Sequence, residues 1–229
     1  MTMISSNLQS VRHRIVQACN ACGRSADPPF LLAVSKTFGP EAVRAAYAAG
    51  QVAFGENYIQ EGVDKIAALR DLPLEWHCIG PVQSNKTRPV AENFDWVHSV
   101  DRLKIAERLS AQRPVEKGPL QICIQVNVDG SESKSGVAPV DVAALARAIA
   151  SLPLLRLRGL MTIPAPAQDF AAACAVHRST RALFDALRAD GLALDTLSMG
   201  MSADLEAAVQ CGSTLLRVGS AIFGGRRPL

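Results

Sequence analysis

The sequence lacks any apolar stretch of about 18 residues without charges, the length that a transmembrane helix needs. Residues 1–19 carry polar and basic side chains throughout, so they predict an amphipathic helix and not a secretory signal. The formal net charge is only +3, and no basic stripe or nucleic-acid-binding module is present. We therefore expect a cytoplasmic protein without membrane or nucleic-acid partners.

The six cysteines lack the spacing of a zinc site or of a disulfide framework. Cys19 and Cys22 form a CxxC pair, but no second pair or nearby histidine supplies the other ligands. The pair lies in the predicted leading helix, whereas a redox CxxC usually lies near a βαβ unit. We expect packing thiols, and no disulfide in a reducing compartment.

Strand-like and helix-like patterns alternate through the rest of the chain. The predicted strands are residues 28–36, 51–57, 74–80, 95–100, 119–129, 154–163, 193–200 and 213–219. Such alternation indicates an α/β fold with a parallel sheet covered by helices. Eight units predict a (β/α)8 TIM barrel, here with an extra N-terminal helix, and an open doubly wound sheet is the alternative. No linker or repeat divides the chain, so residues 1–229 are predicted to form a single domain.

Lys36 ends the first predicted strand, and such barrels carry their sites at the carboxyl ends of the strands. A lysine amine that is partly removed from water loses proton affinity. It then becomes a nucleophile for carbonyl compounds, as a Schiff-base lysine must be. The alternative is a lysine at the rim whose ammonium group extends into solvent.

The segments after the seventh and eighth predicted strands suit an anion, because loops at these positions form a common phosphate site in barrels. Ser202 is predicted to cap the helix of residues 203–212, as Asp101 is for the helix of residues 101–112. Gly219 and Ser220 open the last short helix. Arg217 adds a permanent cation beside them, for a pyridine nitrogen, a phosphate or a simple ion pair. The alternative is that Ser202 serves only as a helix cap and Gly219 only allows the chain to turn.

Several long motifs resemble the YggS/PROSC family, also called pyridoxal phosphate homeostasis proteins. The matching stretches are AVSKT, FGENYIQE, WHCIGPVQSNK, VNVDGSESKSG, GLMTIPAP and SMGMSADLEAAVQCGSTLLRVGSAIFG. The resemblance covers almost the whole chain. The resemblance implies the barrel of fold-type III pyridoxal 5′-phosphate (PLP) proteins, similar to the N-terminal domain of alanine racemases. Cys78 departs from the family signature WHxIGxxQxNK, which more often has Phe or Met there, and we expect it to alter packing only.

The resemblance also implies roles for individual residues. Lys36 matches the lysine that holds PLP covalently as a Schiff base, and Arg217 matches the arginine that faces the pyridine nitrogen. The other positions that it places around the cofactor are Asn57, Ser198, Met199, Ser202, Gly219 and Ser220. Of these, the last three match phosphate-binding positions. Lys134 matches a loop near the mouth, with an accessory role in cofactor transfer.

The sequence favours a PLP carrier over an enzyme. In the similar alanine racemases, a tyrosine from a C-terminal β-domain acts opposite the lysine. Here only a short helix follows the eighth predicted strand, and the tyrosines are Tyr47 within a helix and Tyr58 at a helix start. We expect a monomer that buffers PLP and delivers it to apo-enzymes. A minor amino-acid racemase or lyase, with water or His77 as the second group, and a regulatory module that reports PLP occupancy are the alternatives.

Overall fold

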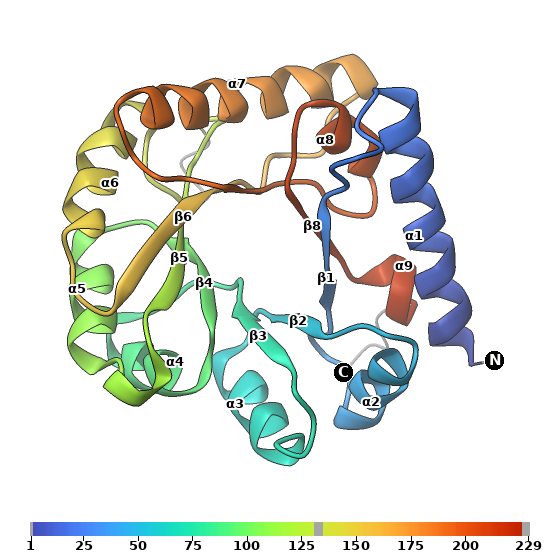
Figure 1. The fold of residues 1–229 in the computed structure, drawn as a ribbon, viewed down its shortest axis with the longest axis horizontal. Coiled ribbons are helices and arrows are strands. Elements are labelled where there is room, and N and C mark those ends of the chain that lie inside the picture. The colour runs from blue at the N-terminus through green and yellow to red at the C-terminus, as the bar shows by residue number, and fades with distance from the viewer. Residues whose placement is uncertain (1, 131–134, 226–229) are drawn as a thin grey trace.

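The structure, a computed structural model, describes residues 2–130 and 135–225. Parallel strands close into a barrel in chain order, with β8 paired to β1 (Figure 1). The strands are β1 Phe30–Val34, β2 Ala53–Glu56, β3 Glu75–Cys78, β4 Trp96–Val100, β5 Leu120–Gln125, β6 Leu155–Met161, β7 Thr196–Ser198 and β8 Leu215–Val218. The predicted (β/α)8 barrel is confirmed, and the open doubly wound sheet is wrong.

The helices form a ring outside the strands (Figure 1). They are α1 Met3–Ala21, α2 Pro40–Ala48, α3 Ile59–Ala68, α4 Thr87–Asn93, α5 Leu103–Gln112, α6 Val142–Ala150, α7 Phe170–Ala189, α8 Leu205–Gln210 and α9 Ser220–Phe223. Short 3-10 turns occupy Ser84–Lys86, Val115–Lys117 and Pro139–Asp141. No helix in residues 2–130 or 135–225 is long and apolar enough to cross a membrane.

The extra N-terminal helix α1 packs on the outside of the barrel beside α8 and α9 (Figure 1). It buries Leu8, Val11 and Ile15, which recur at helical spacing and so form one apolar stripe. Cys19 extends this buried stripe, and Cys22 is the residue that ends the helix. The positions of Cys19 and Cys22 therefore agree with the interpretation of both as packing thiols.

Strands β2 and β4 are buried along their whole length, as expected when helices cover one face of a parallel sheet and packed side chains the other. The predicted strand of residues 119–129 is shorter in the structure, because β5 ends at Gln125. Beyond it, the Asn127 N–H group donates to the Val137 carbonyl instead of to a neighbouring strand. The chain thus leaves the barrel after Gln125.

Two predicted helix caps are wrong. Helix α5 begins at Leu103, one residue later than an Asp101 cap requires, and Asp101 instead accepts from the side chain of Arg102. Helix α8 begins at Leu205, so Asp204, and not Ser202, precedes it. The Asp204 carboxylate accepts the N–H group of Met201 at 2.7 Å, which closes a turn ahead of the helix. Ser202 lies within that turn.

Candidate functional site

A cavity of about 400 Å³ opens at the carboxyl ends of the strands. The residues that line it are Val34, Lys36, Phe38, Asn57, Ile79, Ile163, Met201, Ser202, Ala203, Arg217, Gly219, Ser220 and Gly224. The structure therefore brings together, from segments that are far apart in the sequence, six of the predicted site residues: Lys36, Asn57, Ser202, Arg217, Gly219 and Ser220. The apolar members of the lining were not predicted, because their patterns are those of ordinary strand ends.

Lys36 follows β1 and is half-buried, and the backbone on both sides of it is anchored. The Ser35 hydroxyl donates to Glu56 Oε1 at 2.6 Å, and the Thr37 N–H group donates to Glu61 Oε1 at 2.6 Å. Thr37 has a φ of 68°, in the left-handed region that a β-branched residue rarely adopts. The surrounding contacts hold this conformation, and such strain is typical of functional sites.

A buried ion cluster lies behind Lys36. Lys65 Nζ lies 2.7 Å from the Ser35 carbonyl, 2.7 Å from Glu56 Oε1 and 2.6 Å from Glu61 Oε1. Burial raises the pKa of Glu56, and the neighbouring ammonium group opposes that effect. Sequence reasoning missed Lys65, because a lone lysine in an amphipathic helix ordinarily faces solvent. The only signal for a buried Lys65 was its position in the predicted helix that follows FGEN.

Arg217 lies in β8, and only 3% of it is exposed. Its guanidinium group donates to the Ser198 carbonyl at 2.6 Å, to Ser198 Oγ at 2.7 Å and to the Thr162 carbonyl at 2.8 Å. Burial lowers the pKa of Arg217 to about 10, so the group is still protonated at neutral pH. These bonds use three of the five N–H donors of a guanidinium group. The other donors bond to no described residue.

Ser198 and Met199 do not line the cavity, although the family resemblance places both beside the cofactor. Ser198 is wholly buried behind Arg217, and its hydroxyl also contacts His98 Nδ1 at 2.8 Å. Met199 is wholly buried in the hydrophobic core. These two residues therefore support the wall of the cavity and do not form its surface.

The loops after β7 and β8 meet at one edge of the cavity, where the Ser220 and Ser202 hydroxyl oxygens lie 3.5 Å apart. A Cβ atom at Gly219 would lie 3.1 Å from the Val34 carbonyl oxygen, so the backbone passes close to β1 there. Ser220 begins α9, and the first N–H groups of any helix have no intrahelical acceptor. This edge therefore presents hydrogen-bond donors of the kind that an anion needs.

Asn57 follows β2, and its Oδ1 atom is buried without a hydrogen bond from any described residue. A Cβ atom at Gly80 would lie 2.0 Å from the Asn57 carbonyl oxygen, so only glycine fits beside it. A buried acceptor without a partner costs free energy, and a ligand donor would remove that cost. Asn57 is thus held in place at the cavity with an unused acceptor.

One further residue considered from the sequence, His77, lies away from this cavity. His77 is wholly buried in the barrel, contacts Glu75 and His98 through its ring nitrogens, and does not line the cavity. Lys134 lies outside the described residues. Over the described part of the chain, no cluster of three or more His, Cys, Asp or Glu side chains could hold a metal ion.

Comparisons with known proteins show what the whole chain is similar to. The family model described as alanine racemase, N-terminal domain, matches residues 6–227. A protein of Pseudomonas aeruginosa named pyridoxal phosphate homeostasis protein is 58% identical, over 99% of this chain and 97% of its own length. A protein of the same name from Escherichia coli K12 is 52% identical, over 99% and 98%. The structure of PipY from Synechococcus elongatus with PLP bound has a TM-score of 0.84 and 38% identity, over 96% of this chain and all of that one.

Proposed function

The chain belongs to the YggS/PROSC family of pyridoxal phosphate homeostasis proteins, and on that premise we propose that the cavity at the barrel mouth holds PLP with Lys36 as its covalent anchor. Its role is to bind PLP in homeostasis of the cofactor, as a carrier or buffer. The observation that carries this function is the convergence of Lys36, Arg217 and the Ser202–Ser220 edge on one cavity.

The residues of the cavity fit PLP in size and in chemistry. A volume of about 400 Å³ lies within the range of small-molecule sites. The amine of Lys36 suits an aldehyde, the two hydroxyl groups suit a phosphate, and the unpaired Asn57 Oδ1 suits a donor on the ring. When bound, PLP supplies an aldehyde carbon that reacts with amines and a ring that withdraws electrons.

The protein side then has separate tasks. Lys36 is presented by a turn that Glu56 and Glu61 anchor, so its amine is oriented before the cofactor arrives. Ser202 and Ser220 bind the phosphate, with Gly219 allowing the backbone close approach. Arg217 donates to the pyridine nitrogen, and a donor at that atom disfavours its protonation. A ring without that proton withdraws electrons less strongly, which suits storage more than catalysis.

The lining supports a carrier with little catalytic activity. General acid–base catalysis needs a second group placed across from the first. Among the described lining residues, the side chains that carry a titratable nitrogen are Lys36 and Arg217, and none is a carboxyl, histidine or tyrosine. Tyr58 is 57% exposed and outside the lining, and Tyr47 lies within α2. Apo-enzymes of PLP are the proposed recipients.

Borohydride reduction of the loaded protein tests the anchor. It should leave a phosphopyridoxyl group on the peptide that contains Lys36. Lys36→Ala should abolish this label and the yellow colour, while Lys104→Ala, at an exposed position of α5, should keep both. An unchanged label in Lys36→Ala would assign the anchor to another lysine.

Turnover and transfer assays test the carrier role. Single-enantiomer amino acids incubated with the loaded protein should show no sustained racemisation or elimination, and enzyme-like rates would establish the alternative. Mixed with an apo-enzyme of PLP, the loaded protein should activate it. Activation by the same amount of free PLP is the reference, and no activation by the loaded protein would contradict delivery.

A further inference from the structure

A row of polar side chains crosses the interior of the barrel, from the cavity to the opposite face. Arg217 Nη1 lies 2.7 Å from Ser198 Oγ, and Ser198 Oγ lies 2.8 Å from His98 Nδ1. His98 Nε2 lies 2.9 Å from His77 Nδ1, and His77 Nε2 lies 2.8 Å from Glu75 Oε1. We name Glu75, His77, His98 and Ser198 the barrel relay. Its three inner members are fully buried or nearly so.

Burial keeps both histidines of the relay neutral. Burial lowers the pKa of His77, against the opposing effect of Glu75, and it lowers the pKa of His98 well below its ordinary value. The hydrogen bond from His77 lowers the pKa of Glu75 and so keeps it a carboxylate. The relay thus joins a cation at one end to an anion at the other through neutral groups.

The chemistry of the two ends fixes every proton between them. A guanidinium group can only donate, and a carboxylate can only accept. His77 must therefore donate from Nε2 to Glu75, which leaves its Nδ1 as an acceptor for the Nε2–H group of His98. His98 Nδ1 is then an acceptor for the Ser198 hydroxyl proton. With that proton committed, the lone pairs of Ser198 Oγ are free to accept from Arg217.

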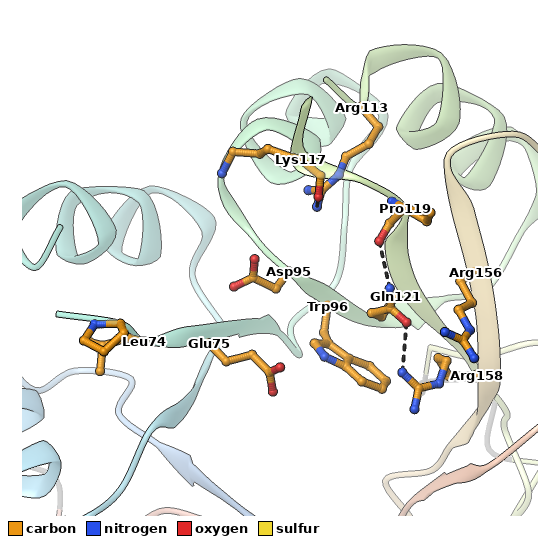
Figure 2. A pocket seen from close by; sticks show the side chains of 11 residues that line it. Leu74, Glu75, Asp95, Trp96, Arg113, Lys117, Pro119, Gln121, Arg156 and Arg158 are labelled. Carbon is orange, nitrogen blue, oxygen red and sulfur yellow. Dashed lines mark hydrogen bonds between the residues drawn. The ribbon is translucent and has the colours of Figure 1, made fainter. Parts of the chain in front are cut away.

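The far end of the relay opens into a second cavity, of about 530 Å³, at the amino ends of the strands (Figure 2). Glu75 begins β3 there, and its side chain is 45% exposed. Trp96 stacks on His77 with ring centroids 5.3 Å apart, and the Arg158 guanidinium lies 4.7 Å from the Trp96 ring centroid. The other charged groups of this cavity are Asp95, Arg113, Lys117 and Arg156, and Asp195 pairs with Arg158.

We propose that the barrel relay positions Arg217, so that the charge of Glu75 on the far face of the barrel contributes to cofactor affinity at the mouth. The proposal rests on the function proposed above, in which Arg217 donates to the pyridine nitrogen. It explains why polar groups occupy a barrel core that otherwise favours branched apolar residues. The charge of Asp204 acts on Arg217 through space and raises its pKa, but no described acidic side chain lies within ion-pair distance of Arg217. The relay gives Arg217 a link to a carboxylate through hydrogen bonds.

Polarisation along the row is the physical link between its ends. Chains of hydrogen bonds in a low dielectric strengthen one another, because each group becomes a better acceptor when its own proton is attracted onward. The carboxylate of Glu75 therefore makes Ser198 Oγ a stronger acceptor for Arg217. Neutralising Glu75 partly weakens each hydrogen bond of the row. The guanidinium group of Arg217 is then held less firmly in place.

The proton order is tested without cofactor. Nitrogen-15 NMR of the PLP-free protein at pH 7 distinguishes the two neutral tautomers of histidine and the imidazolium form. Both His77 and His98 should be neutral with the proton on Nε2. A proton on Nδ1 of either ring, or an imidazolium at either position, would overturn the relay. This test stands whether or not PLP binds at Lys36.

The effect on the site is tested with Glu75→Gln, whose amide keeps an acceptor but removes the charge. Glu92→Gln is the matched control, since Glu92 has a side chain 43% exposed and lies away from both cavities. Glu75→Gln should weaken PLP binding about twofold, a part of the free energy of one hydrogen bond. It should also shift the pH profile of visible absorbance of the loaded protein, and Glu92→Gln should do neither.

Failures of the two proposals are distinguishable. If Glu75→Gln carries the borohydride label on Lys36 and matches the wild type in affinity and in pH profile, the relay proposal is wrong and the proposed function stands. If the wild-type protein takes no label on Lys36, the proposed function fails, and the link from the relay to the cofactor fails with it. The side chain of Glu75 is 45% exposed, and circular dichroism of Glu75→Gln checks that the variant folds before its affinity is compared.

Discussion

Arg217 Nη1 donates to both the carbonyl and the hydroxyl oxygen of Ser198, at 2.6 and 2.7 Å, so β8 is tied to the end of β7. The Nη2 atom of the same side chain donates to the carbonyl of Thr162, just after β6. One side chain thus joins the carboxyl ends of three consecutive strands. The residue proposed to face the cofactor is also a structural element of the barrel mouth.

Arg217→Lys should therefore reduce both stability and cofactor affinity. An ammonium group keeps the charge but cannot reproduce the planar fork, so at least one buried acceptor loses its donor. The expected loss is about 2–3 kcal/mol in the free energy of unfolding, measured by urea denaturation of the PLP-free protein. PLP affinity, measured by equilibrium dialysis, should fall about tenfold or more.

Arg44→Lys is the control for this substitution, because the Arg44 side chain is 45% exposed and pairs with Asp71 at the surface. Its effect on the free energy of unfolding should stay within about 0.5 kcal/mol. Equal effects of the two substitutions would show that the buried fork of Arg217 has no special contribution.

Ser202→Ala should weaken PLP retention without removing the covalent anchor. The hydroxyl is one of two at the anion edge, and loss of one hydrogen bond to a charged group predicts an affinity about tenfold lower. Borohydride should still label Lys36. Ser179→Ala, on the exposed side of α7, is the control and should retain PLP like the wild type. Unchanged retention in Ser202→Ala would remove this serine from the phosphate site.

The contrast between Ser202 and Asp204 shows what local sequence patterns determine here. The alternation of apolar runs predicted the barrel, because burial periodicity is a local property of each segment. The position of Ser202 at the mouth followed from the barrel, but its role as a helix cap did not hold. The Asp204 carboxylate accepts a hydrogen bond from the N–H group of Met201, and the helix starts later than predicted. The position of this start depends on the conformation of the whole turn.

Lys65 and the histidines of the barrel relay mark the limit of prediction from sequence. Lys65 and Glu56 are nine positions apart, and His98 and Ser198 are one hundred positions apart. No periodicity connects residues at such separations, because their contact is created by strand register and barrel closure. The lining residues that were predicted lay at strand ends, where the fold alone brings them to one face.

Lys65→Met should destabilise the protein strongly. It removes the cation from a cluster in which Glu56 is fully buried, and a buried carboxylate left unpaired costs about 3–5 kcal/mol. Urea denaturation should show this loss. Lys104→Met, at an exposed position of α5, should change the free energy of unfolding by less than about 0.5 kcal/mol. Similar values for both variants would mean that the buried cluster contributes no more than a surface charge.

Acidification should destabilise the fold through His77 and His98. Burial lowers the pKa of both rings in the folded protein, whereas in the unfolded chain each titrates near pH 6.5. Below about pH 6.5 the unfolded chain binds more protons than the folded protein, so stability that is present above this pH is lost as the pH falls. Each ring contributes a slope of up to about 1.4 kcal/mol per pH unit.

Urea denaturation between pH 7.5 and pH 5 measures this slope, which should correspond to the uptake of about two protons on unfolding. His98→Gln removes one of the two titrating rings, so its slope should be smaller by about one proton, whatever its absolute stability. His13→Gln, at an exposed position of α1, is the control and should keep the wild-type slope. A wild-type slope in His98→Gln would contradict the claim that His98 is held neutral by burial. Because only differences in slope are compared, a general loss of stability in the His98 variant leaves the test intact.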